Sequence, residues 1–414
     1  MKKIVFSLMI FLMVILMASA LGEAGFRIRD MFDRNRGLRN SVGDINRRYC
    51  HGLKPNSRFR LIASKKNEYN VPVCINNFGF RGKDILKNKR PGVARIMVMG
   101  DSFTFGVGAR ENETIPFLIE ERLLAKGREA EVINAGFGHY SPLLHYLKLK
   151  DEYMEFKPDM VIYLFDFSDL ADDWRFERNL VYDKFGRIVR CDPAFVDGRR
   201  DWWKTMRIHS KLCVYIHNKV VRLFDKIRIL GLKGYITAKM NHKRAKALIV
   251  TGRGKSEVTD TIVYDGYLMI RGRDKLPDIM KHFKRTEKYL NLIKYRLAED
   301  GIPMVLVIYP YGIHVGPAQW GEGRAYWGFK KGKAYDDYYA FDILEDYARR
   351  NNLPCINVLP DFLKRKERKL FFDIDGHFTP EANSIVAEAI TSNGAFDSLL
   401  NAVCGRRDKT GIAK

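Results

Sequence analysis

Three residues of this chain have the types and context needed for nucleophilic catalysis. Ser102 follows the apolar run at residues 96–99, so its hydroxyl would stand just beyond the end of a buried strand. Asp375 and His377 lie far away in the sequence, before Thr379, which can cap a helix that a proline opens. A serine becomes a strong nucleophile when an imidazole takes its proton and a carboxylate orients the imidazole. We therefore expect Ser102 to be the nucleophile, His377 the base and Asp375 the carboxylate that orients the imidazole.

The surroundings of these residues favour the same chemistry. A glycine-rich turn at residues 105–108 follows Ser102, and backbone N–H groups in such a turn can point at an oxyanion. His377 stands on a loop that enters a late helix, as the base does in several unrelated serine hydrolases.

Two short motifs resemble those of the SGNH, or GDSL, hydrolase superfamily: GDSFTFG at 100–106 and DGHFTPEAN at 375–383. The resemblance implies that Ser102 is the nucleophile, that its backbone N–H is one oxyanion donor, and that Asp375 and His377 complete the triad. The family often has Asp three residues before the histidine, where this chain has Ile, so it is similar to the Asp-x-His variant of polysaccharide-modifying members. Asp373 is the alternative orienter.

The resemblance also implies two further oxyanion donors. In the second block, residues 134–142, both Gly136 and Gly138 are available, while His139 stands at the usual glycine position, and we choose the backbone N–H of Gly138. The third block usually reads Gly-x-Asn-Asp, and here Ser168 replaces the asparagine. Loss of one such donor costs about 100- to 1000-fold in rate. We therefore expect weak or specialised activity.

From residue 94 onward, short apolar runs alternate with helical stretches, which indicates a parallel sheet covered on both faces. The sequence predicts an α/β fold, a three-layer αβα sandwich with a five-stranded parallel sheet, and we expect the flavodoxin-like strand order 2-1-3-4-5. Ligands bind beyond the carboxyl ends of such strands, where Ser102, Gly138, Ser168 and His377 would converge. The expected strands are 95–99, 131–134, 160–165, 304–309 and 355–359, and the expected helices are 113–126, 142–156, 281–299 and 338–350.

We divide the chain by changes in its pattern. Within a basic helical insertion, the run 213–216 favours an amphipathic helix that would form a lid, a membrane contact, a substrate flap or simply a solvated face. The segments are a signal peptide or membrane anchor (1–23), an accessory segment (24–92), the first part of the SGNH-like domain (93–175), the insertion (176–280), the second part of the domain (281–402) and a tail (403–414).

The amino terminus predicts contact with a membrane. Two lysines precede an apolar stretch at residues 4–21, which is borderline between a signal peptide and an anchor, and Ala-Ser-Ala at 18–20 suits cleavage. Arginines downstream, at 27–39, would place that side in the cytoplasm by the positive-inside rule. Export, and hence an extracytoplasmic, anchored or secreted protein, follows from the family resemblance.

Composition limits the class of partner. The 414 residues are 46% apolar, which predicts a globular chain. The net charge of +23 favours an anionic polysaccharide or an anionic lipid surface as partner, and the alternative is that the basic residues simply face solvent. Nucleic acid is disfavoured because no zinc-finger spacing or RNP-like motif occurs. Six cysteines are scattered without a Cys-x-x-Cys pair, so disulfides cannot be assigned.

Two other groups have alternative interpretations. The acidic residues at 166–177 (Asp166, Asp169, Asp172, Asp173 and Glu177), with His139, could hold a hard metal ion, but capping of the next helix or pairing with Arg175 and Arg178 is simpler. The segment 309–312 is a turn whose aromatic rings could stack on a sugar. We expect no cofactor and no metal.

These observations predict a serine esterase or O-acyltransferase of SGNH type. We expect it to act on acyl esters, above all O-acetyl esters, of cell-envelope or exported carbohydrate. The alternative is a non-catalytic glycan-binding or assembly protein on a degenerate SGNH fold, which Ser168 and His139 support.

Overall fold

The computed structural model describes residues 2–31, 48–63, 67–192 and 266–410. The chain divides into two compact units. One comprises Met1–Arg36 and Phe195–Lys255, and the other comprises Gly37–Ala194 and Ser256–Lys414.

In the first unit, the described residues form helix α1 (Lys2–Met31). Among the helices of the described ranges, none is both long and apolar enough to cross a membrane. The signal peptide or anchor expected at residues 1–23 therefore stays a prediction.

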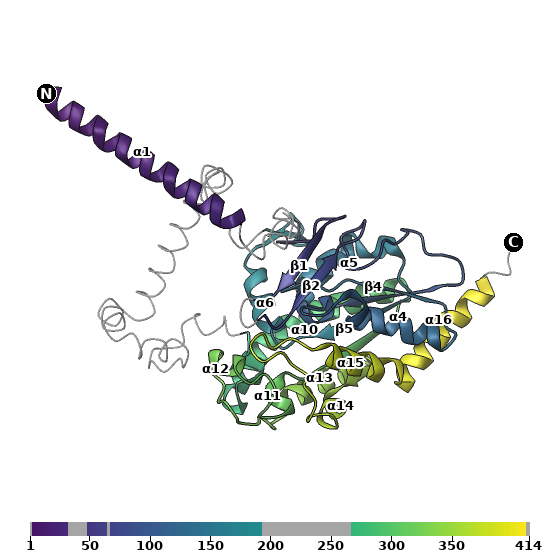
Figure 1. Ribbon diagram of the computed structural model, residues 1–414. Helices are drawn as coiled ribbons and strands as arrows, with labels where there is room; N and C mark the ends of the chain where they lie inside the picture. Colours follow the sequence, from purple (N-terminus) through teal and green to yellow (C-terminus); the bar gives the residue numbers. More distant parts are fainter. Residues whose placement is uncertain (1, 32–47, 64–66, 193–265, 411–414) are drawn as a thin grey trace. The chain divides into compact units, whose positions relative to one another are not determined.

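The second unit is built on a five-stranded parallel sheet with the order β4-β3-β5-β8-β9. In chain order this is 2-1-3-4-5, so the expected topology is confirmed. Two strands of this sheet, β4 and β5, are labelled in Figure 1. Every residue of β3, β5 and β8 is buried, because these strands are covered on both faces, and all of their residues except Arg95 of β3 are apolar or aromatic. The strands are β3 (Ala94–Met99), β4 (Ala130–Asn134), β5 (Met160–Phe165), β8 (Met304–Ile308) and β9 (Cys355–Asn357).

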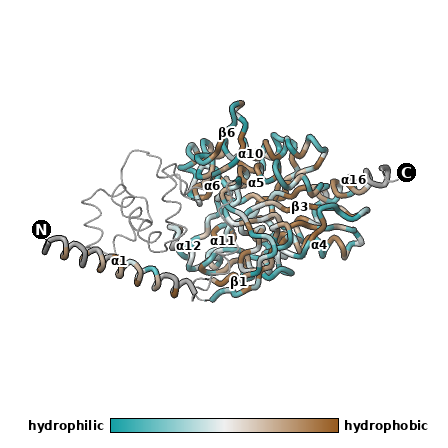
Figure 2. The backbone as a smooth tube through the Cα atoms, turned by 90° about the horizontal axis from the view of Figure 1, so that it is seen from above, coloured by the Kyte–Doolittle hydropathy of each residue, from teal (hydrophilic) through white to brown (hydrophobic). Residues whose placement is uncertain are grey.

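Two helical layers enclose the sheet. Helices α4 (Ile115–Ala125) and α15 (Pro380–Thr391) pack together. Helices α5, α6 and α10 form a second packed group, and right-handed crossovers put α5 and α10 on the face opposite α4. Figure 2 shows hydrophobic residues around β3 in the interior. The remaining helices are α5 (Pro142–Asp151), α6 (Asp169–Glu177), α10 (Leu276–Glu299), α13 (Tyr339–Arg350), α14 (Leu359–Leu363) and α16 (Gly394–Thr410), with short turns η1 (Glu111–Glu113), η2 (Tyr153–Phe156), η4 (Leu268–Ile270), η5 (Arg273–Lys275), α11 (Gly312–Val315) and α12 (Gly323–Tyr326).

Three local predictions need correction. Helix α10 begins at Leu276 rather than residue 281, with a proline in its first turn. The last strand ends at Asn357, because Leu359 already begins α14. Thr379 is the N-cap of α15, but its hydroxyl donates 2.8 Å to the carbonyl of Lys369 rather than capping the helix. That hydroxyl ties the start of α15 to the preceding chain.

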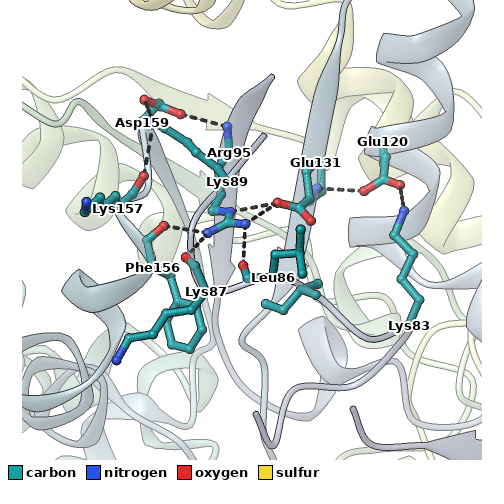
Figure 3. Close-up of polar contacts among 12 residues, drawn as sticks. Lys83, Leu86, Lys87, Lys89, Arg95, Glu120, Glu131, Phe156, Lys157 and Asp159 are labelled. Carbon is teal, nitrogen blue, oxygen red and sulfur yellow. Dashed lines mark hydrogen bonds and ion pairs between the residues drawn. The ribbon is translucent and has the colours of Figure 1, made fainter. Parts of the chain in front are cut away.

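The accessory segment is bonded to the sheet through Arg95 of β3 (Figure 3). This fully buried guanidinium donates to the carbonyls of Leu86 (2.7 Å), Lys87 (2.7 Å) and Phe156 (2.8 Å), and its Nε donates to Glu131 of β4 at 2.7 Å. All these acceptors share one charged donor. Arg95 therefore connects the accessory segment to strands β3 and β4 of the sheet.

Upstream in the same segment, β1 (Arg58–Ile62) and β2 (Asn70–Cys74) form an antiparallel pair. After α6, β6 (Leu180–Tyr182) and β7 (Ile188–Cys191) form another antiparallel pair within the expected insertion. The amphipathic helix expected around 213–216 lies outside the described residues. No disulfide joins the five cysteines in the described ranges.

Candidate active site

The turn after β3 places Ser102 at the carboxyl end of the sheet. Gly100 has a φ of +154°, and a Cβ there would lie 2.2 Å from Thr104 Oγ1 and 2.8 Å from the carbonyl oxygen of Leu164. Only glycine fits this close approach. Asp101 then caps the short helix α3 (Ser102–Phe105) by accepting the Phe103 N–H at 2.9 Å. Ser102 therefore stands at the first position of α3.

The loop before α15 brings His377 and Asp375 to that serine. Gly376 between them has a φ of +87°, and a Cβ there would lie 2.5 Å from the indole nitrogen of Trp320. His377 Nε2 lies 2.7 Å from Ser102 Oγ, and His377 Nδ1 contacts Asp375 Oδ1. The structure thus joins these three residues in one hydrogen-bonded chain.

Asp373, the alternative orienter, has different partners. Its backbone carbonyl accepts the N–H groups of Glu322 (3.0 Å) and Gly323 (2.7 Å), and its carboxylate lies 3.3 Å from Lys369 Nζ. Asp375 is therefore the acid that contacts the imidazole.

The charges of Asp375 and His377 favour transfer of the Ser102 proton to the imidazole. Burial disfavours the imidazolium of His377, yet the charge and hydrogen bond of Asp375 raise its pKa above the usual value. Burial acts against the Asp375 carboxylate, but His377 and the Tyr69 hydroxyl lower its pKa to about 2. Asp375 is thus ionised across the neutral range, and the imidazole is supported as it becomes charged.

A second carboxyl group lies against the serine. Asp101 Oδ2 accepts the Ser102 hydroxyl at 3.1 Å, and burial followed by the charge of Asp166 raises the pKa of Asp101 to about 7. Tyr309 links the two acids, donating to Asp166 at 2.7 Å and to Asp101 at 3.3 Å. Tyr311 also donates to Asp166. Because both tyrosines are buried, the expectation that segment 309–312 stacks on a sugar is wrong for these rings.

The oxyanion donors differ in part from expectation. The N–H groups of Gly106 and Val107 donate to the carbonyl of Ser102 at 3.0 and 3.1 Å, so the turn closes on itself and these two groups do not face an oxyanion. Gly138 and Ser168 follow β4 and β5, as expected. In the described residues no hydrogen bond joins either of them to Ser102, and their role stays a prediction.

The two candidate donors are held by other contacts. The carbonyl of Gly138 accepts His51 Nε2 at 2.9 Å, and His139 beside it has a φ of +62°. The N–H of Ser168 donates to Asp166 at 2.7 Å. These bonds fix the backbone at Gly138 and at Ser168.

The acidic residues after β5 serve the surrounding backbone. Asp166 accepts the Ser168 N–H at 2.7 Å just before α6, but Ser168, the N-cap, makes no side-chain capping bond, so the expected cap is not formed there. Asp173 accepts the Leu143 N–H of α5 at 2.9 Å. Arg178 lies over the ring of Trp174, 3.3 Å from its centroid, instead of pairing with them. Within the described ranges, no group of three or more His, Cys, Asp or Glu side chains is placed to hold a metal ion.

Sequence reasoning missed three residues that hold the site. Arg81 donates to the carbonyls of Phe105, Gly106 (2.7 Å) and Ala109 (2.6 Å), which fixes the turn after Ser102. Glu68 and Tyr69 contact the loop of Asp375. All three come from the accessory segment, and no motif or spacing in the sequence pairs them with positions so distant.

Comparison with known proteins finds no matching family model and no match among curated proteins. Solved structures do match. The chain is similar to an acetyl xylan esterase (17% identity, 72% of this chain and 98% of that chain, TM-score 0.34) and to a lipase/acylhydrolase from Enterococcus faecalis (14%, 76% and 96%, TM-score 0.33). It is also similar to a protein from Desulfitobacterium hafniense whose name refers to the G-D-S-L family (10%, 72% and 98%, TM-score 0.34). The function proposed below rests on the geometry of the site.

Proposed function

We propose that this chain is a serine esterase or O-acyltransferase of SGNH type. The observation that carries the proposal is the chain of contacts from Ser102 Oγ to His377 Nε2, at 2.7 Å, and from His377 Nδ1 to Asp375. A hydroxyl, an imidazole and a buried carboxylate in this order form the arrangement that activates a serine.

The geometry supports a two-step reaction. Ser102 Oγ attacks the acyl carbonyl while its proton passes to His377 Nε2, and Asp375 holds the imidazole through Nδ1–H. The tetrahedral intermediate then collapses as Nε2 returns the proton to the leaving sugar oxygen. Water or a second sugar hydroxyl, deprotonated by the same imidazole, then attacks the acyl carbonyl, and Nε2 returns that proton to Ser102 Oγ as the acyl group leaves. In this proposal the N–H groups of Ser102 and Gly138 and the hydroxyl of Ser168 stabilise the oxyanion.

The proposed substrates are acyl esters, above all O-acetyl esters, of cell-envelope or exported carbohydrate. The net charge of +23 supports an anionic glycan or membrane surface as partner. Binding of the protein to anionic and neutral glycans of equal length, at low and high salt, tests this. Equal retention of both at low salt would contradict an electrostatic role.

The proposed location is extracytoplasmic, with residues 1–23 acting as a signal peptide or anchor. Support comes from the Lys-Lys start, the apolar stretch at 4–21 and the exposed Phe6, Phe11 and Leu16 of α1. Mass determination of the mature amino terminus distinguishes cleavage after Ala20 from an intact anchor. A full-length protein recovered in the soluble cytoplasmic fraction would contradict both.

Turnover of an acetylated oligosaccharide tests the catalytic proposal. We expect Ser102→Ala and His377→Ala each to lower turnover by about 10⁴-fold or more. A fluorophosphonate should label the wild type and Ser392→Ala, whose serine lies at the end of α15, but not Ser102→Ala. Folded wild-type protein that neither labels nor turns over the ester, yet still binds the glycan, would favour the non-catalytic binder.

A further inference from the structure

The β1–β2 hairpin reaches the acid of the triad. Tyr69, one residue before β2, donates its hydroxyl to Asp375 Oδ2 at 2.8 Å. The other oxygen of the same carboxylate, Oδ1, contacts His377 Nδ1. Both oxygens of Asp375 are therefore engaged, one by the imidazole and one by a residue 306 positions away.

The neighbouring Glu68 holds the backbone of the same loop. Its two carboxylate oxygens accept the N–H groups of Ile374 and Asp375, each at 3.0 Å. Such charge-assisted bonds are among the stronger ones in proteins. Two acceptors on one rigid carboxylate fix the direction of this peptide segment, and with it the point from which the Asp375 side chain leaves the backbone.

The phenol ring is itself packed in place. Tyr69 contacts Phe372, with ring centroids 5.1 Å apart, and a Cβ on Gly108 would lie 2.9 Å from Tyr69 Cδ1. The ring thus lies between the loop of Asp375 and the turn that follows Ser102. A hydroxyl held this way restricts the rotation of the carboxylate it contacts.

We propose that Tyr69 and Glu68 are positioning residues for the triad, with Glu68 fixing the Asp375 backbone and Tyr69 fixing its carboxylate. The expected effect of these two residues on turnover rests on the proposed esterase function. Their expected effect on the pKa of His377 does not depend on that function. Orientation of a catalytic imidazole depends on its carboxylate partner, and partners of that carboxylate act through it.

The groups that surround His377 determine how the proposal can be measured. Asp375, Asp101 and Asp166 all act on its charge, and Asp375 in turn faces Tyr69 and Glu68. The Tyr69 hydroxyl presents the positive end of its dipole to Asp375 and offsets part of the carboxylate charge. In Tyr69→Phe more of that charge acts on the imidazolium, so the pKa of His377 should rise.

An NMR titration of the histidine ring protons tests this without requiring turnover, since the His377→Ala spectrum identifies the resonance. Tyr347→Phe is the matched control, because that buried phenol donates to Asn291 at 3.0 Å between α13 and α10. We expect the His377 titration to move to higher pH in Tyr69→Phe and to remain unchanged in Tyr347→Phe. A titration unchanged or lowered in Tyr69→Phe would overturn the proposal.

Kinetics provide the second measurement. On the acetylated oligosaccharide, kcat should fall about 10- to 100-fold in Tyr69→Phe with KM unchanged, because Tyr69 acts through Asp375. Glu68→Gln replaces one carboxylate oxygen with an NH2 group, which cannot accept the backbone N–H that it faces. The kcat of Glu68→Gln should therefore fall at least as far as that of Tyr69→Phe. If the wild type does not turn over the ester, the proposed function is contradicted but the positioning proposal is not. The titration still decides whether the hairpin positions His377.

Discussion

Asp101 and His377 share the hydroxyl of Ser102. Asp101 Oδ2 accepts it at 3.1 Å, while His377 Nε2 lies 2.7 Å from the same oxygen. One hydrogen cannot point fully at both acceptors. The protonation of Asp101, whose pKa burial and Asp166 raise to about 7, therefore affects how readily the serine proton reaches the imidazole.

Asp101→Asn should shift the pH dependence of the proposed ester turnover. The negative charge of Asp101 helps to raise the pKa of His377, so its removal lowers that pKa, and the acidic limb of kcat/KM should move to lower pH. Asparagine retains an oxygen that can cap α3. The measurement is a kcat/KM profile beside Asp300→Asn, a residue on the exposed end of α10. A limb that stays in place or moves upward would show that Asp101 does not act on the base.

Ser168→Ala tests the third oxyanion donor. If the hydroxyl donates to the developing charge, kcat should fall by about 100-fold with little change in KM. Ser168→Asn, which introduces the residue usual in the family, should keep or raise kcat. Ser57→Ala is the control, since Ser57 donates to Lys54 in an exposed turn. Wild-type kcat in Ser168→Ala would remove this residue from the oxyanion hole.

Arg95→Met should destabilise the fold. The substitution leaves Glu131 and three carbonyls around a buried site without their donor, and breaking a buried pair costs about 3–5 kcal/mol. Arg349→Met, which removes an exposed pair with Asp346, should leave the free energy of unfolding almost unchanged. Urea unfolding measures both. Equal losses in the two variants would contradict the structural role of Arg95.

Acid should destabilise the protein partly through His314. Burial lowers the pKa of His314 to about 3, and its Nδ1 accepts the Tyr311 N–H at 3.1 Å. Since its pKa is lower in the folded than in the unfolded state, the unfolded state binds the proton first. The free energy of unfolding should therefore fall as pH drops below 6.5 toward 3, by about 1.4 kcal/mol per pH unit for one such group.

Replacement of His314 isolates that contribution. In His314→Gln the decrease in the free energy of unfolding between pH 6 and pH 4 should be shallower, whatever the variant's stability at neutral pH. Urea unfolding at several pH values measures the slope. A slope equal to that of the wild type would show that His314 does not remain neutral in the folded protein.

The sequence determined the sheet and the three residues of the proton chain. Strand and helix positions were predictable because the apolar runs at β3, β5 and β8 are continuous and are separated by amphipathic helices of ordinary length. Helix boundaries were less predictable from the sequence. Helix α10, for example, begins five residues before its expected start. The motif around Ser102 and the Asp-x-His motif were local patterns and needed no knowledge of distant contacts.

Tertiary structure alone decided what surrounds those residues. Glu68, Tyr69, Arg81 and Tyr309 reach the site through hydrogen bonds to distant backbone or carboxyl groups. A sequence pattern records periodicity and neighbours along the chain, whereas such bonds depend on where the accessory segment packs. The types and order of the reacting groups are therefore written in the sequence. Their burial, pKa values and orientation arise only when remote segments exclude water from around them.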